Sequence, residues 1–102
     1  MPLKHITAAE AKQLVDGGAL LVDVREANEY AGENIPGARN EPLSSIGRSP
    51  IAGASAVVFH CKSGARTRMN AAALAGSTDA QAYIMDGGIE AWKAAGFPVR
   101  RG

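Results

Sequence analysis

Short apolar runs occur at intervals along the chain and end in small, polar or charged residues. Residues 19–24 (Ala-Leu-Leu-Val-Asp-Val) form a nearly continuous run rather than an alternating one. A strand buried on both faces of a parallel sheet has this pattern. The same reasoning predicts strands at residues 56–60 and 82–85, and a weaker edge strand around residues 38–40.

Segments of helical composition lie between these runs. Thr7 and Glu10 form a capping-box pattern that predicts a helix over residues 8–16, and two glycines at 17–18 supply its stop. The alanine-rich residues 66–75 predict a further helix. Shorter elements are expected as helices at 26–32 and 89–95, a turn at 35–38, and a loop with room for one short helix at 42–53.

The alternation of strands with helices predicts an α/β fold, in which a parallel sheet is covered by helices on both faces. Such sheets bind ligands at the carboxyl ends of their strands. Cys61 follows the end of one predicted strand and Arg25 follows the end of another. We therefore expect these two residues to lie near each other, although they are far apart in the sequence.

The composition indicates one small domain over residues 1–102. Eleven basic and ten acidic residues give a formal net charge of +1, and no basic block indicates nucleic acid or an acidic membrane as a partner. No apolar run resembles a signal core or spans a bilayer. The single cysteine fits a reducing compartment. We expect a cytoplasmic chain without a metal or cofactor; a membrane tether stays open if the native chain continues past Gly102.

The chemistry of the sequence is concentrated at that cysteine. Cys61 stands where a predicted strand ends and a helix begins, so loop amides, the helix dipole and three cations (Lys62, Arg66 and Arg68) favour an anion there. These groups lower the pKa of a thiol from about 8.5 towards neutrality, and the thiolate is the nucleophile. A buried structural thiol and a plain phosphate-binding loop are the alternatives, the latter weakened by the lack of a P-loop pattern.

Four segments, in order, carry a resemblance to a known family. They are residues 21–26 (Leu-Val-Asp-Val-Arg-Glu) followed by Glu29, Tyr30 and Gly32; residues 34–38 (Asn-Ile-Pro-Gly-Ala) leading to Pro42; residues 61–67 (Cys-Lys-Ser-Gly-Ala-Arg-Thr); and residues 86–88 (Asp-Gly-Gly) with Trp92, Gly96, Phe97, Pro98 and Val99. Over nearly the whole chain this pattern resembles the rhodanese family of sulfurtransferases.

The resemblance implies a rhodanese-like three-layer fold, a five-stranded parallel sheet with helices on both faces. It also implies that Cys61 carries a persulfide, formed by attack on the outer sulfur of a small donor such as thiosulfate and then handed to cyanide or a thiol. The persulfide anion is expected to lie among the residues of the following loop: Lys62, Ser63, Gly64, Ala65, Arg66 and Thr67. The positive charges of this loop suit an anionic donor better than an uncharged one.

The sequence departs from the family pattern at Asn34, where many members carry histidine. We expect this difference to affect the local structure rather than the reaction at Cys61. Asp23 and Arg25 are interpreted either as supporting residues of the site or as a structural ion pair. For Arg66 we expect a guanidinium turned towards the bound anion rather than paired with an acidic neighbour. His60 is expected to be a satisfied strand-end histidine.

Residues 87–88 (Gly-Gly) predict a tight turn from strand to helix, and Met69, Met85 and Trp92 are expected to pack in the core. The segment His60-Cys61 followed by Arg66 also resembles the signature of cysteine phosphatases, which place five residues between cysteine and arginine. Only four stand here, which disfavours a phosphatase.

Two further functions stay open beside sulfur transfer. One is a redox or nitrosothiol-handling module that uses an activated Cys61 with a partner thiol, because the chain has no second cysteine. The other is a non-catalytic binding domain of the rhodanese fold, which the presence of Cys61 disfavours.

Overall fold

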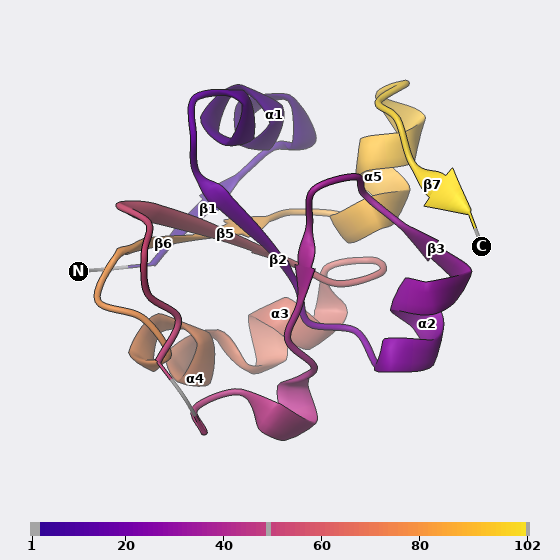
Figure 1. Ribbon diagram of the computed structural model, residues 1–102. Helices are drawn as coiled ribbons and strands as arrows, with labels where there is room; N and C mark the ends of the chain where they lie inside the picture. Colours follow the sequence, from indigo (N-terminus) through magenta and orange to yellow (C-terminus); the bar gives the residue numbers. More distant parts are fainter. Residues whose placement is uncertain (1–2, 49, 102) are drawn as a thin grey trace.

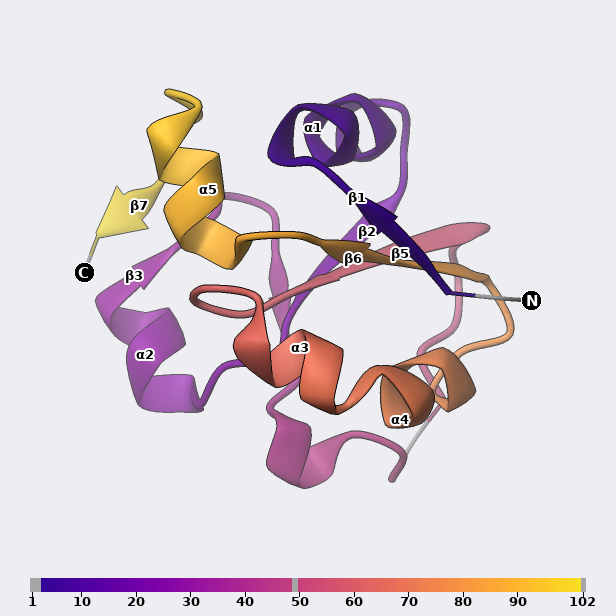
Figure 2. The same cartoon turned by 180° about the vertical axis from the view of Figure 1, so that it is seen from behind.

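Residues 3–48 and 50–101 are described by the structure, a computed structural model, and what the sequence predicts for Met1, Pro2, Ser49 and Gly102 lies outside these residues. A parallel sheet of five strands forms the middle layer (Figures 1 and 2), in the order β1-β6-β5-β2-β4. Its strands are β1 (Lys4–Ile6), β2 (Leu20–Asp23), β4 (Arg39–Asn40), β5 (Ala56–His60) and β6 (Gln81–Met85). The predicted α/β fold with a five-stranded parallel sheet is confirmed.

Helices cover both faces of the sheet. Figures 1 and 2 show α1 and α5 on one face, and α3 and α4 on the other. The helices are α1 (Ala8–Asp16), α2 (Ala27–Gly32), the 3-10 turn η1 (Leu43–Ser45), α3 (Ala65–Met69), α4 (Ala71–Gly76) and α5 (Gly88–Ala94). A small antiparallel pair, β3 (Glu33–Asn34) with β7 (Arg100–Arg101), lies beside α2 and α5.

Two apolar cores, one on each face, hold the layers together. Successive residues of a strand point to opposite faces, so Leu21 and Val58 join the core under α1 and α5, whereas Val22 and Phe59 join the core over α4. All four side chains are at most 1% exposed. Because these strands are buried on both faces, their sequences are continuous apolar runs rather than alternating apolar and polar residues.

Several predicted elements are confirmed with small changes of boundary. The Thr7–Glu10 capping box is present, with the Glu10 amide 3.1 Å from the Thr7 hydroxyl and the Thr7 amide 2.9 Å from the Glu10 carboxylate. The edge strand appears as β4 and the short helix of the 42–53 loop as η1. Strand β1 was not predicted, because its three residues have no apolar run and depend on pairing with β6, in which Lys4 lies opposite Tyr83.

The single helix predicted over residues 66–75 is wrong, because the segment divides into α3 and α4 at Asn70. Asn70 has φ −117° and ψ 22°, and its side-chain amide donates to the Arg66 carbonyl at 2.8 Å. A short polar side chain that bonds the backbone in this way competes with a continuous helix. The break leaves α3 a short helix whose first turn follows the Cys61 loop directly.

Of the three residues expected in the core, two are buried and one is exposed. Met85 and Trp92 are buried as predicted, and the Trp92 indole donates to the Pro98 carbonyl at 2.8 Å. Met69 is 84% exposed, so the prediction that it packs in the core is wrong. It is the last residue of α3, whose buried side chain is Thr67 instead.

Candidate functional site

Cys61 lies at the carboxyl edge of the sheet, in the loop that joins β5 to α3. In the register of the sheet Asp23, the last residue of β2, lies opposite His60, the last residue of β5. The Val24 amide continues this pairing, with a hydrogen bond of 3.0 Å to the His60 carbonyl. The structure thus brings the segments of Arg25 and Cys61 side by side, as the topology of a parallel sheet predicts.

A ring of hydrogen-bond donors surrounds the sulfur of Cys61. The Gly64 amide donates to Sγ at 3.1 Å, and the Thr67 hydroxyl oxygen lies 3.8 Å from the same atom. Thr67 is fully buried, and its hydroxyl donates to the Gly64 carbonyl at 3.0 Å, a bond that uses the same single proton that it could give to Sγ. We call this arrangement, formed by Cys61, Gly64, Arg66 and Thr67, the sulfur cradle.

The sulfur cradle favours the charged form of the thiol. Burial acts to raise the pKa of Cys61, but the amides of Thr67, Gly64 and Arg66 and the Thr67 hydroxyl outweigh it and hold the pKa below its ordinary value of 9.0. Hydrogen bonds to a charged form lower the pKa of an acid in this way. The cradle can therefore stabilise a thiolate, or any anion that replaces it at the same place.

Helix α5 holds the Cys61 loop from the other side. The amide of Ile89 donates to the Cys61 carbonyl at 2.9 Å, and the amide of Glu90 donates to the Lys62 carbonyl at 3.1 Å. These amides belong to the first turn of α5, where N–H groups have no partner within the helix. The loop backbone thus serves as the cap of α5.

Gly88 makes this contact possible. It has φ +59°, and a Cβ there would lie 2.6 Å from the Lys62 carbonyl and closer still to the Cys61 carbonyl oxygen. The sequence predicts the tight turn at Gly87 and Gly88, which is confirmed by φ values of +78° and +59°. It gives no sign of what this turn touches, so the supporting role of Gly88 was missed.

The charged residues of the loop divide into two kinds. Arg66 donates to both carboxylate oxygens of Glu29 in α2, at 2.7 and 2.9 Å, so the expectation that its guanidinium turns towards the anion site does not describe this structure. Lys62 and Arg68 are exposed and form no ion pair with another described residue. Ser63 and Ala65 are also exposed and lie at the open side of the loop.

Asp23 and Arg25 form a buried ion pair, with their side chains 0% and 6% exposed. Nε of Arg25 lies 3.0 Å from both carboxylate oxygens, and Nη2 donates to Asp23 at 2.7 Å and to the Glu33 carbonyl at 2.6 Å. The geometry is that of a structural ion pair, and a supporting role of the two residues at the site stays a prediction. The pair ties the end of β2 to β3 rather than contacting the sulfur.

His60 is buried beneath this loop and only partly satisfied. Its Nδ1 lies 3.2 Å from the Cys61 carbonyl, whereas Nε2 has no hydrogen-bond partner among the described residues and lies 3.7 Å from the Asp23 carboxylate. Burial lowers the pKa of His60 and outweighs the opposing charge of Asp23. The expectation of a satisfied strand-end histidine therefore holds for one ring nitrogen only.

Asn34, the departure from the family pattern, lies in β3. Its side-chain amide donates to the Tyr30 carbonyl at 2.9 Å, at the end of α2. Within the described part of the chain it bonds this helix rather than the Cys61 loop.

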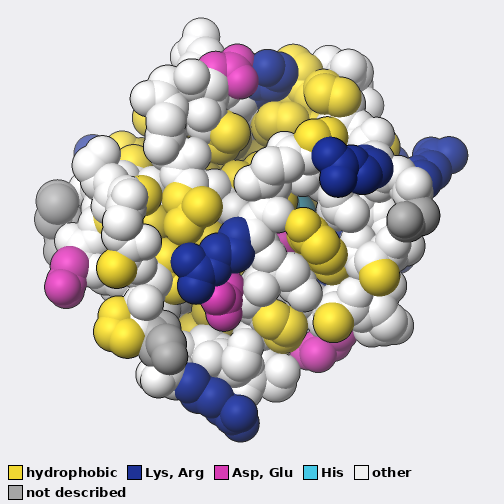
Figure 3. All heavy atoms as spheres, in the orientation of Figure 1, with side chains coloured by type: hydrophobic (Ala, Val, Ile, Leu, Met, Phe, Trp, Pro, Cys, Tyr) yellow, Lys and Arg dark blue, Asp and Glu magenta, His cyan; other side chains and the backbone are white. Residues whose placement is uncertain are grey.

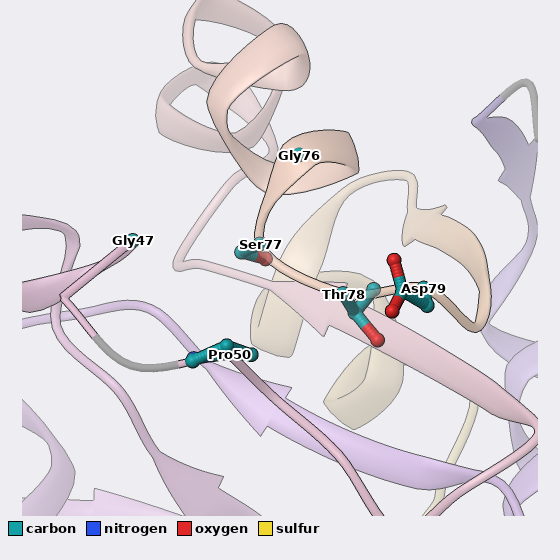
Figure 4. A pocket seen from close by; sticks show the side chains of 6 residues that line it. All are labelled: Gly47, Pro50, Gly76, Ser77, Thr78 and Asp79. Carbon is teal, nitrogen blue, oxygen red and sulfur yellow. The ribbon is translucent and has the colours of Figure 1, made fainter.

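A surface hollow lies away from the Cys61 loop. A hollow of about 150 Å³ (Figure 4) is lined by Gly47, Pro50, Gly76, Ser77, Thr78 and Asp79, none of which belongs to the Cys61 loop. On the face in Figure 3 basic and acidic side chains are interspersed, without a continuous patch of one sign. Residues 3–48 and 50–101 hold no cluster of three His, Cys, Asp or Glu that could bind a metal. No helix within these two ranges is long and apolar enough to cross a bilayer.

Comparisons with known proteins agree with this geometry. The chain matches the Rhodanese-like domain family over residues 7–95. It is 34% identical over 98 residues to the thiosulfate sulfurtransferase GlpE of Ectopseudomonas mendocina, a match that covers 93% of this chain and 88% of that protein. It is 40% identical over 83 residues to the uncharacterized protein slr1261 of Synechocystis, covering 78% of this chain and about half (46%) of that protein.

A solved structure shows the same architecture. The crystal structure of a thiosulfate sulfurtransferase from Pseudomonas aeruginosa is similar with a TM-score of 0.84 at 26% identity, over 97% of this chain and 19% of that chain. The extent of the family match and the similarity to GlpE over most of both chains decide the assignment. The chain belongs to the rhodanese-like domain family.

Proposed function

We propose that this protein is a sulfurtransferase in which Cys61 carries sulfane sulfur from an anionic donor such as thiosulfate to cyanide or a thiol. In the first half-reaction the thiolate attacks the outer sulfur of thiosulfate, the S–S bond of the donor breaks, and sulfite leaves with the electron pair. Cys61–S⁻ and S–SO₃²⁻ thus give Cys61–S–S⁻ and SO₃²⁻. In the second half-reaction cyanide takes the outer sulfur as thiocyanate and restores the thiolate.

The sulfur cradle is the observation that carries this proposal. In it the Gly64 amide donates to Sγ and the Thr67 hydroxyl lies beside the same atom. The loop amides and this hydroxyl outweigh burial and lower the pKa of the thiol without a separate general base. Loop donors that are fixed before the reaction can also stabilise the charge of a persulfide, whose outer sulfur is bonded directly to Sγ, without reorganising. Two of the proteins to which the chain is similar are named thiosulfate sulfurtransferases, and this is why thiosulfate is the donor proposed.

Steady-state turnover tests this proposal. The protein is incubated with thiosulfate and cyanide, and thiocyanate is measured for the wild type, Cys61→Ser and Ser77→Ala. Ser77 is a matched control because its buried hydroxyl bonds the Leu74 carbonyl in α4, outside the Cys61 loop. We expect turnover by the wild type and Ser77→Ala only; equal turnover by Cys61→Ser rejects the proposal.

The same proteins separate the remaining alternatives. A redox or nitrosothiol module gives a Cys61 adduct with a nitrosothiol but no thiocyanate, and a binding domain keeps its partners after Cys61→Ser. A cysteine that must stay a thiolate, in a chain with no second cysteine, suits a reducing compartment such as the cytoplasm. The partners proposed are accordingly a small-molecule sulfur donor and a thiophilic acceptor.

A further inference from the structure

An ion pair joins helix α2 to the sulfur cradle. Arg66 contributes its backbone amide to the cradle, and its guanidinium reaches away to Glu29, with which it makes two parallel hydrogen bonds of 2.7 and 2.9 Å. The side chains of Arg66 and Glu29 are 36% and 29% exposed. Bidentate pairs between arginine and a carboxylate are the strong ones, and this pair fixes a negative charge beside the site.

The Glu29 carboxylate and the Cys61 thiolate both interact with the guanidinium of Arg66. Hydrogen bonds from Arg66 lower the pKa of Glu29 to about 2, so its carboxylate is ionised at any pH at which the thiolate exists. The pKa of Arg66 is raised, first by Glu29 and also by the negative charge of Cys61. Glu29 and an anion at Cys61 therefore compete for one guanidinium.

The charge of the site follows from these contacts. Lys62 and Arg68 form no ion pair with another described residue, whereas the charge of Arg66 is offset by Glu29. Two positive charges, rather than three, are left to balance the thiolate and a donor. Thiosulfate carries two negative charges, and an organic thiosulfonate or persulfide carries one.

We propose that Glu29 is a specificity-determining residue that, by occupying the guanidinium of Arg66, disfavours doubly charged sulfur donors relative to singly charged ones. This inference rests on the proposed sulfur transfer for its substrate class. Methanethiosulfonate is a matched probe, because it offers the same outer sulfur as thiosulfate with one charge fewer. Its reaction with Cys61–S⁻ gives Cys61–S–S⁻ and CH₃SO₂⁻, with two negative charges on each side.

Glu29→Gln tests the proposal with little change of size, since the amide oxygen can still accept one of the two hydrogen bonds from Arg66, although the amide nitrogen cannot accept the other. Removing one charge from this partly exposed ion pair is expected to change the rate by about threefold per unit charge of the reagent. We expect kcat/KM to rise about tenfold for thiosulfate and about threefold for methanethiosulfonate. The ratio between the two donors then rises about threefold, and the rise shrinks in high salt.

Alkylation of Cys61 gives a second measurement that does not depend on sulfur transfer. Iodoacetate and iodoacetamide have nearly the same shape and differ by one negative charge. The rate with iodoacetate divided by the rate with iodoacetamide therefore reports the electrostatic potential at the sulfur. We expect this ratio to rise about threefold in Glu29→Gln. Asp16→Asn is the control, because it removes the same charge from a comparable ion pair, that of Lys12 and Asp16 in α1 at 2.8 Å; it should leave the ratio unchanged.

The outcomes separate this inference from the proposed function. A raised alkylation ratio without sulfur transfer from either donor rejects the sulfurtransferase and retains Glu29 as the residue that sets anion access to Cys61. An alkylation ratio equal to that of the wild type, or an equal gain for both donors, overturns the inference even if turnover is fast. A fall of thiosulfate kcat/KM in Glu29→Gln overturns it as well, because Glu29 then only positions Arg66.

Discussion

Replacing Gly88 with alanine tests how α5 holds the Cys61 loop. The new Cβ would lie 2.6 Å from the Lys62 carbonyl, so either the loop or the start of α5 must move. Alanine at φ +59° costs about 1 kcal/mol in backbone strain. Overpacking adds about 1–3 kcal/mol, and weakening the hydrogen bonds from Ile89 and Glu90 adds about 1 kcal/mol. We expect the free energy of unfolding to fall by about 3–5 kcal/mol in total.

Gly37→Ala is the matched control for this loss. Gly37 also has a positive φ, +86°, but a Cβ there has no atom within 4 Å. Its alanine variant should lose only the strain of about 1 kcal/mol. Urea unfolding gives the free energy of unfolding of both variants, and the rate of alkylation of Cys61 by iodoacetamide reports whether its loop has moved. Equal losses in the two variants would refute the argument that close approach to the loop, rather than backbone conformation, requires glycine at 88.

Three further changes probe the site. Thr67→Val removes the hydroxyl near Sγ, so the pKa of Cys61 should rise and the pH profile of its alkylation move to higher pH; an unmoved profile contradicts the cradle. Asp23→Asn leaves the buried Arg25 without a carboxylate and should cost about 3–5 kcal/mol in urea unfolding, and a loss below about 1 kcal/mol contradicts this reasoning. Because the Glu29 pKa is depressed to about 2, its pair with Arg66 stabilises the fold above about pH 5 and is lost as the pH falls towards 2. After screening it is worth about 1 kcal/mol, so Glu29→Gln should unfold more easily than the wild type at about pH 6, and the difference should shrink as the pH falls through about 2; a constant difference contradicts the linkage.

The apolar runs made most of the sheet predictable. Residues 20–23 and 56–60 are buried on both faces, and that requirement is visible in the sequence itself. Strand β1 depends instead on its partner β6, and its three residues have little preference of their own. The division of the helix at Asn70 was likewise hidden, because alanine-rich residues favour one continuous helix and only the contact of Asn70 with the Arg66 carbonyl shows the break.

At the site, the sequence predicted a candidate nucleophile and its loop, but not the residues that arrive from elsewhere in the fold. The spacing around Cys61 shows a small loop with cations, which predicts an activated thiol. The direction of the Arg66 side chain depends on Glu29, a residue 37 positions away. The contact between Gly88 and the loop likewise depends on how α5 is placed against the sheet. Such distant pairings are set by tertiary structure, on which local patterns are silent.

A single turnover with thiosulfate and no acceptor tests the central claim most directly. The protein is mixed with excess thiosulfate, sulfite release is followed with time, and the chain is then digested to locate any added sulfur by mass spectrometry. We predict a burst of one sulfite per chain, one extra sulfur atom on Cys61, and its loss as thiocyanate when cyanide is added. Absence of the burst, or extra sulfur that Cys61→Ser acquires equally well, would contradict the assignment of Cys61 as the sulfur carrier.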